Sequence, residues 1–264
     1  MDFEIKHRDG HVLWRGEAYD LANAVSRAVD AHTDLAGANL AELDLAGANL
    51  ESARLAGANL ARARLRNANL EEADLRDADL SGATLDGANI EEVDLSRALL
   101  VDASARGANF EEAVLEGADL TRVRAEGCNF EECDLRGAKL ENATFRRSNF
   151  EEVRLDGVHA VSASFNGCNL EKASLRDADL AGADLSSSNM ERCDFRGARM
   201  WGANLSGANL ERADMRGADL TDCDFRESNL DRVDVDGAKM DGAKMESANT
   251  SRLRGTPAST TPYR

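Results

Sequence analysis

A five-residue period runs through most of the chain and constrains its fold more than any other feature. From Ala31 to Thr250 the sequence divides into 44 consecutive units of five residues, without an insertion or deletion. The third residue of nearly every unit is small, and the fifth is Leu in 26 units, Phe in seven and Met in five. Because a fixed short period is typical of chains whose units pack on their neighbours, we expect a solenoid.

Each unit has the pattern of a short strand followed by a corner. In the triplet Ala58-Asn59-Leu60, apolar and polar residues alternate, as in a strand with one buried face. The other two residues often end in Gly, as in Ala46-Gly47, which suits a tight turn. An α-helix is excluded, because five residues advance about 500° around its axis and would scatter the leucines. The fold class that we predict is an all-β solenoid.

A second period of 20 residues predicts how many units close one coil. The fourth residue of every fourth unit is Asn, from Asn49 to Asn249, and the residue two positions later is Glu from Glu51 through Glu211 and then Asp231. Four units per coil make a four-sided cross-section. Residues 20 apart then stack about 4.8 Å from each other, and about 11 coils form a rod roughly 53 Å long.

The N-terminal residues 1–32 lack the period and are predicted to cap the first coil. Residues 3–14 have the alternation of a hairpin with its turn at Arg8-Asp9-Gly10. Asp20 is suited to cap a helix that ends near His32. A cap is expected because an open solenoid end exposes its core and its unpaired strand edges.

The C-terminal end has no comparable pattern. We expect the β-helix to occupy residues 33–250 and residues 251–264 to form a flexible tail. Without a cap, the last coil with Val235, Met240 and Met245 would be covered by a second copy of itself, which gives the hypothesis of a two-fold homodimer.

Charge limits the class of partner. The chain carries 49 Asp and Glu against 32 Lys and Arg, for a net charge of −17, so direct binding to nucleic acid is disfavoured and a basic partner is favoured. We find neither the apolar stretch of a signal peptide nor a run long enough to span a membrane. We therefore expect a cytoplasmic protein that makes no contact with membranes.

Cysteine and histidine give no sign of a metal, a cofactor or a catalytic centre. The five cysteines occupy inward third positions and form no CxxC motif, so we interpret them as small, reduced core residues. His7 and His11 flank the predicted hairpin turn, without a recognised metal motif. A filled solenoid offers no pocket for a nucleophile and its base, so we expect neither an enzyme nor a cofactor.

Pairs of glutamates form the most distinctive surface pattern. They recur every 20 residues at the corner that follows the Asn positions, and we call them the acidic column: Glu71, Glu72, Glu91, Glu92, Glu111, Glu112, Glu131, Glu132, Glu151 and Glu152. Like charges at that spacing repel by roughly 0.9 kcal/mol per pair even in water. From Lys172 onward a base replaces the second acid. The column is either a solvated face or a partner-binding surface, and both interpretations stay open.

Four apolar residues at outward positions offer an alternative contact. Leu99, Val101, Val161 and Trp201 are expected on the side opposite the Asn positions. Scattered exposed apolar residues are common, so this contact is a hypothesis.

Units such as Ala38-Asn39-Leu40 and Ala73-Asp74-Leu75 resemble the A(D/N)LXX signature of pentapeptide-repeat proteins. The resemblance implies a right-handed quadrilateral β-helix. Members of the quinolone-resistance type are acidic rods proposed to occupy the DNA site of type II topoisomerases and to protect them from poisons. By that resemblance this chain would bind gyrase or topoisomerase IV through the acidic column. It lacks the interrupting loops and the C-terminal helix found in those members, and the alternative is a general protein-interaction scaffold.

Overall fold

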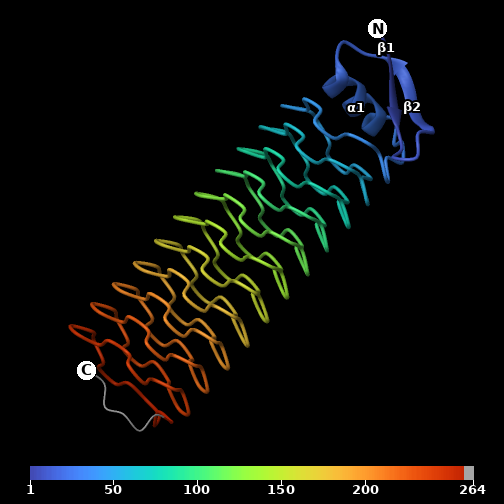
Figure 1. Cartoon of the computed structure of the whole chain (residues 1–264). Coiled ribbons are helices and arrows are strands. Elements are labelled where there is room, and N and C mark those ends of the chain that lie inside the picture. Colours follow the sequence, from blue (N-terminus) through green and yellow to red (C-terminus); the bar gives the residue numbers. More distant parts are fainter. Residues whose placement is uncertain (259–264) are drawn as a thin grey trace.

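The computed structural model describes residues 1–258 and shows a long shaft of stacked coils with a cap at the N-terminal end (Figure 1). Along the shaft, each bridged residue pairs in parallel with the residue 20 positions later, from Asn39 with Asn59 to Asp234 with Arg254. Each side of a coil contributes one bridged residue, so the bridges are isolated ones. The fold is therefore a solenoid whose coil consumes 20 residues.

Backbone hydrogen bonds run along the shaft and join each coil to the next. The Leu60 N–H donates to the carbonyl of Asp79 over 2.7 Å, and the Asn59 N–H donates to the carbonyl of Ala38 over 2.8 Å. This pattern repeats from coil to coil and satisfies backbone groups that would otherwise be buried and unpaired. Each coil consequently serves as the template for its neighbour.

The corners are tight turns in which the second residue of each five-residue unit has a positive φ. At one corner the Ala48 N–H donates to the carbonyl of Leu45 over 3.1 Å, and Gly47 between them has φ of 67°. A positive φ at the third residue of a four-residue turn is the mark of the type II turn, which favours Gly there. Other corners place charged residues in the same conformation, as Glu42 does with φ of 61°.

The third and fifth residues of the units point inward and form one core that extends from Ile5 of the cap to Ala243. Phenylalanines stack along the axis in its middle. The ring centroids of Phe110 and Phe130 lie 4.6 Å apart, and those of Phe130 and Phe150 lie 4.7 Å apart. Phe145 meets Phe130 edge to face with centroids 5.7 Å apart. Such pairs stabilise beyond the area that they bury.

The cap consists of a hairpin and one helix. Strands β1 (Asp2–Lys6) and β2 (Val12–Glu17) pair antiparallel, and helix α1 spans Leu21–Asp30. The Asp20 carboxylate caps the helix by accepting the Asn23 N–H over 2.8 Å. Val25 and Ala28 of α1 are buried in the same core as the first coil.

The hairpin also pairs with the edge of the first coil. His7, directly after β1, forms an antiparallel bridge with Ala38. The Asn39 N–H donates to the carbonyl of Lys6 over 2.8 Å, and the Arg8 N–H donates to the carbonyl of Gly37 over 3.0 Å. These bonds occupy a strand edge that would otherwise be open.

The ladder continues past residue 250, where the sequence predicts a flexible tail. Arg254 bridges to Asp234, and the Gly237 N–H donates to the carbonyl of Thr256 over 3.0 Å. This added unit lies beside the coil that was expected to be open. Residues 259–264 of the expected tail lie outside the described residues.

The extension lies beside the residues expected at a dimer end. Val235 and Met240 are each 1% exposed and lie within the chain's own core. Met245 is partly buried and packs against the core beside Ala248 and Leu253.

We predict that Phe130→Ala destabilises the shaft by about 3–5 kcal/mol, because it leaves a cavity in the ring stack. Phe195→Ala is the matched control, since Phe195 is equally buried but has no ring contact among those found in residues 1–258. Phe195→Ala should lower the free energy of unfolding by about 0.5–1.5 kcal/mol less than Phe130→Ala does, because it breaks none of these ring contacts. Urea unfolding followed by circular dichroism measures both, and equal losses would contradict a specific role for the stack.

Candidate functional site

The 20-residue coil brings the acidic column together at one corner of the shaft. The two rows of the column differ in exposure. The first glutamate of each pair is half-buried and the second is exposed, as in Glu111 and Glu112. The two rows also have different neighbours.

The first row is tied to a ladder of asparagines. The Asn129 side-chain amide donates to Glu111 Oε2 over 3.0 Å, and the Asn149 amide donates to Glu131 Oε2 over 3.0 Å. Asn149 also donates to Asn129 Oδ1 over 3.1 Å and accepts the Glu151 N–H over 3.3 Å. The asparagines are therefore structural, and they hold the first-row carboxylates in place.

The second row occupies a conformation that favours glycine. Glu92, Glu112 and Glu132 have φ of 56°, 57° and 57°. A residue with a side chain costs about 1 kcal/mol or more in the left-handed region. Many corners elsewhere carry Gly at this position, as Gly107 and Gly117 do. Backbone stability thus does not explain a glutamate at these positions.

Among the described residues, basic side chains neutralise only one end of the acidic column. Within residues 1–258, no Lys or Arg forms a salt bridge with the first four pairs, which we call the open acidic block: Glu71, Glu72, Glu91, Glu92, Glu111, Glu112, Glu131 and Glu132. The fifth pair is neutralised by Lys172, whose Nζ lies 3.4 Å from Glu151 and 2.8 Å from Glu152.

The same corner is compensated beyond the open acidic block. Arg212 lies 3.5 Å from Glu191, Arg232 lies 3.7 Å from Glu211, and Arg252 lies 2.5 Å from Asp231. Elsewhere on the shaft, Arg97 similarly binds Asp77 over 2.7 Å from the neighbouring coil. Lys and Arg thus form ion pairs with stacked acids at other places on the shaft, whereas no such ion pair forms in the open acidic block of the described chain.

The pKa of Glu91 responds to this crowding. Burial first, and then the charges of Glu71, Glu111, Glu92 and Glu112, raise the pKa of its carboxyl above the usual 4.5. The side-chain hydrogen bond from Arg97 instead lowers the pKa of Asp77 below the usual 3.8. The two carboxyls therefore have opposite effects on stability at neutral pH.

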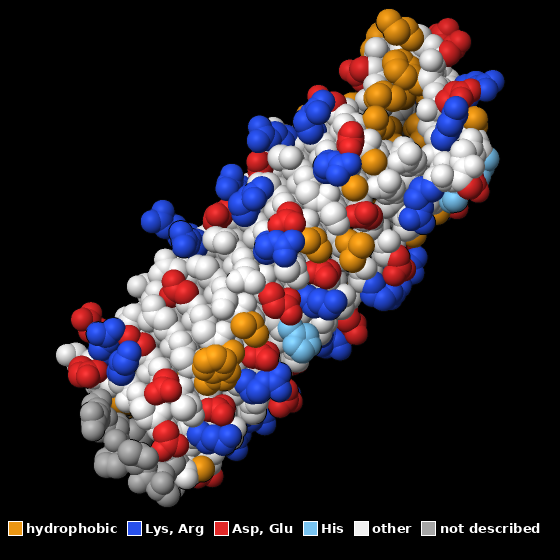
Figure 2. Space-filling view, in the orientation of Figure 1, with side chains coloured by type: hydrophobic (Ala, Val, Ile, Leu, Met, Phe, Trp, Pro, Cys, Tyr) orange, Lys and Arg blue, Asp and Glu red, His pale blue; other side chains and the backbone are white. Residues whose placement is uncertain are grey.

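The outward apolar residues do not form one patch. Leu99, Val161 and Trp201 are 43%, 36% and 58% exposed, whereas Val101 is half-buried. Val161 and Trp201 share one corner two coils apart, with the buried Ala181 between them. Figure 2 shows small, separate apolar groups among charged side chains along the shaft, and a larger apolar group on the cap.

The cysteines are packed in the core, as predicted. All five are buried, and burial raises the pKa of the Cys128, Cys168 and Cys223 thiols to about 12. Their thiols donate to nearby carbonyls, as Cys133 Sγ does to Phe110 over 2.7 Å. Such thiols are poor nucleophiles and poor metal ligands.

The histidines beside the hairpin turn have a neighbour that sequence reasoning missed. His7 and His11 converge on Asp9, whose carboxylate accepts the His11 N–H over 3.2 Å. That bond first, and then contacts with both rings, lower the pKa of Asp9 to about 2. The His-x-Asp-x-His spacing of residues 7–11 was the available signal.

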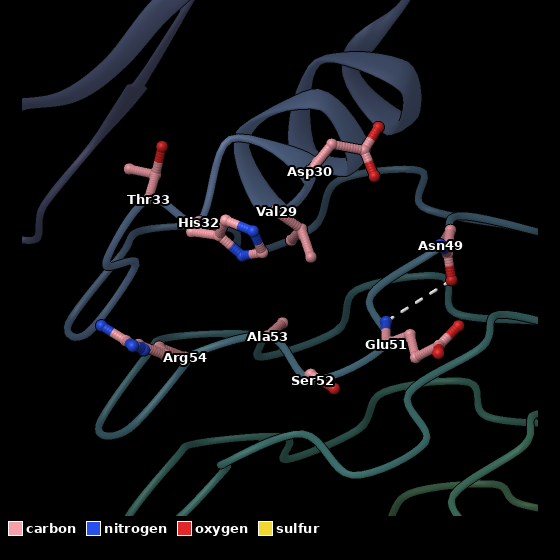
Figure 3. A pocket seen from close by; sticks show the side chains of 9 residues that line it. All are labelled: Val29, Asp30, His32, Thr33, Asn49, Glu51, Ser52, Ala53 and Arg54. Carbon is pink, nitrogen blue, oxygen red and sulfur yellow. Dashed lines mark hydrogen bonds between the residues drawn. The ribbon is translucent and has the colours of Figure 1, made fainter.

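An open groove of about 470 Å³ lies between the C-terminal end of α1 and residues 49–54 of the shaft (Figure 3). Val29, Asp30 and His32 line its cap side, and Glu51 and Arg54 are among the residues on its coil side. The Glu51 N–H donates to Asn49 Oδ1 over 3.5 Å, and the same corner contact recurs in most coils of the asparagine ladder, as from Glu71 to Asn69. The groove is thus a notch between cap and shaft.

Neutralising Glu91 and Asp77 should shift stability in opposite directions. A raised carboxyl pKa destabilises the folded state at neutral pH, and the effect disappears as the pH falls through the folded pKa. Glu91→Gln should therefore raise the denaturation midpoint at pH 7, with the gain lost below pH 4.5. Asp77→Asn should lower the midpoint at pH 7, with the difference lost as the pH falls below 3.8. Thermal unfolding across pH tests both, and a stabilising Asp77→Asn or a destabilising Glu91→Gln would contradict the electrostatic analysis.

Within residues 1–258, no helix combines the length and the apolar character that crossing a bilayer requires.

No curated protein matches the chain significantly. Among solved structures, the chain is similar to HetL of the cyanobacterium Nostoc, a pentapeptide repeat protein involved in the regulation of heterocyst differentiation. The identity is 27% over 89% of this chain and 97% of HetL, with a TM-score of 0.38.

Two further solved structures are similar to the chain. Full-length QnrB1, a plasmid-mediated fluoroquinolone resistance protein, is 20% identical over 76% of this chain and 90% of its own, with a TM-score of 0.38. A thylakoid-lumen protein of Arabidopsis thaliana is 37% identical over 40% of this chain and 63% of its own, with a TM-score of 0.22.

Family models cover most of the shaft. The model for pentapeptide repeats in eight copies matches residues 33–71 and 58–97. The model for the pentapeptide repeat region matches residues 103–180, 126–199 and 162–240. With the periodic sequence and the 20-residue coil, these matches show that the chain belongs to the pentapeptide-repeat family.

Proposed function

We propose that the chain is a non-catalytic, cytoplasmic interaction protein whose acidic column takes the place of DNA phosphates in the basic groove of a type II topoisomerase, gyrase or topoisomerase IV. The observation that carries the proposal is the open acidic block, whose eight carboxylates have no salt-bridge partner within the described chain. The topoisomerase partner and the right-handed winding follow from the family resemblance, whereas the expected count of about 11 coils follows from the 20-residue period of the sequence.

The spacing of the charges supports the mimicry. Two carboxylates per coil recur about every 4.8 Å, and B-DNA carries about 2.8 charges over that length. The open acidic block spans three coil intervals, or roughly 14 Å, a length of duplex that carries about eight phosphates. A basic groove shaped for a duplex would therefore meet a similar number of negative charges.

The energetics favour a basic partner. Repulsion within the open acidic block is relieved when cations of a partner approach, so part of the electrostatic strain becomes binding energy. The asparagine ladder fixes the first row, as in the bond of 3.0 Å from Asn129 to Glu111, and lowers the entropic cost of binding. Salt should weaken the complex, because exposed charges are screened.

A general interaction scaffold is the second candidate. Trp201 is 58% exposed on the shaft, and aromatic side chains often anchor protein interfaces. This candidate does not need the acidic column. A homodimer through the last coil is compatible with either function and would use Met245, Ala248 and Leu253, which are partly buried there.

A supercoiling assay with purified gyrase tests the first candidate. The parent protein should inhibit supercoiling or reduce cleavage caused by a gyrase poison. The triple variant Glu92→Lys, Glu112→Lys and Glu132→Lys should lose at least about tenfold in potency, because it reverses the exposed row and leaves the asparagine ladder in place. Raising the salt concentration should weaken the parent protein.

The control reverses three exposed acids elsewhere and changes the net charge equally: Asp222→Lys, Glu227→Lys and Glu246→Lys. This control should retain the activity of the parent. Equal activity of all three proteins, or equal loss in both variants, would contradict DNA mimicry by the acidic column.

Trp201→Ser separates the two candidates. If the acidic column is the binding surface, this change should leave gyrase inhibition within about twofold of the parent, because Trp201 lies at another corner. A loss as large as that of the triple glutamate variant would favour the scaffold.

A further inference from the structure

Three side chains with metal-ligating atoms converge at the turn of the cap hairpin. His7 Nδ1 lies 3.0 Å from Asp9 Oδ1, and His11 Nδ1 lies 2.6 Å from the same oxygen. One ligand atom of each residue lies within 4.8 Å of the others. Two atoms that each bind a metal at about 2.1 Å lie roughly 3–3.4 Å apart, so small rotations of these side chains would bring all three onto one ion.

The backbone of the hairpin holds the two histidines opposite each other. The pairing of β1 with β2 shifts register between Ile5 and Lys6, a bulge that redirects the side chains beyond it. After it, the His7 N–H donates to the carbonyl of His11 over 2.9 Å, and the Gly10 N–H donates to the carbonyl of His7 over 2.9 Å. The two rings stack with centroids 4.7 Å apart and planes at 19°.

The shaft determines which nitrogen of His7 faces the cluster. A Cβ built on Gly37 of the first coil would lie 2.2 Å from His7 Nε2, so this nitrogen packs closely over the glycine. His7 Nδ1 then points to Asp9. The ring of His7 is thus held between the hairpin and the first coil, which is the preorganisation that a metal ligand requires.

Asp9 contacts His7 through both its backbone and its side chain. The Asp9 N–H lies 3.2 Å from His7 Nδ1, and Asp9 Oδ1 lies 3.0 Å from the same nitrogen. A metal ion bound to this nitrogen and this oxygen would take the place of the direct contact between them.

We propose that His7, Asp9 and His11 bind one divalent first-row transition-metal ion, of which Zn²⁺ is the test ion. Two imidazole nitrogens and one carboxylate oxygen suit this class better than Mg²⁺ or Ca²⁺, which prefer oxygen ligands. The Asp9 and His11 side chains are 63% and 58% exposed, so water can complete the coordination. The ion would join both ends of the hairpin turn and, through His7, fasten the cap to the first coil.

Calorimetric titration of Zn²⁺ into the untagged full chain, freed of metal with a chelator, tests the site. We expect saturable binding of one ion per chain. Asp9→Asn and His11→Gln should each weaken binding at least about tenfold, because each alters or removes a ligand. His159→Gln is the matched control, since His159 is exposed on the shaft far along the sequence from the cap, and it should bind like the parent.

Amide hydrogen exchange gives a second readout that needs no variant. Zn²⁺ should slow exchange in the parent at His7 and Arg8, whose N–H groups bond to His11 and Gly37, and leave the middle of the shaft unchanged. The proposal is overturned by absence of saturable binding, by Asp9→Asn and His11→Gln variants that bind like the parent, by an equal loss in His159→Gln, or by unchanged exchange at the hairpin.

Discussion

The axial ladder of backbone hydrogen bonds is the interaction on which the rest of this structure depends. Each coil donates to the next through bonds such as the one of 2.7 Å from Leu60 to Asp79. Because the pairing repeats every 20 residues, it converts a period in the sequence into columns on the surface. A shift of one residue in this register would move core leucines outward, so burial and backbone pairing enforce the same geometry.

The same register gives the acidic column two destabilising features, which are repulsion between stacked charges and a strained backbone at its corner. Stacking brings like charges close, and the corner places Glu92 and Glu112 in backbone conformations that favour glycine. Lys172 and Arg212 show that bases fit the same corner and form ion pairs there. The proposed partner would account for a surface that carries these costs over four coils, and a solenoid with a continuous core can tolerate such local costs.

Much of this architecture was predictable because the repeat has no insertion. The alternation in units such as Ala58-Asn59-Leu60 is local, and the recurrence of Asn49 through Asn249 specifies the coil. The hairpin and the helix after Asp20 also lie in the segments expected for them. The family models bear out the family that these units resemble.

Two features were not predictable in the same way. The unit at residues 251–255 has Leu253 at its third position and Gly255 at its fifth, so it lacks the repeat signal and joins the ladder through backbone bonds that are independent of side chains. Asp9 approaches both histidines in the turn that follows the register shift between Ile5 and Lys6, and alternation alone reveals neither feature. Contacts formed where the backbone departs from the repeat could thus be seen only in the structure.

Distances between spin labels along one corner test the register most directly. Labels placed pairwise at residues 72 and 152, 72 and 192, and 72 and 212 should give distances of about 19, 29 and 34 Å, because the pairs are separated by four, six and seven coils. The distance should rise by about 4.8 Å for every 20 residues. Distances that do not increase linearly, or a slope that corresponds to another number of residues per coil, would contradict the single acidic corner.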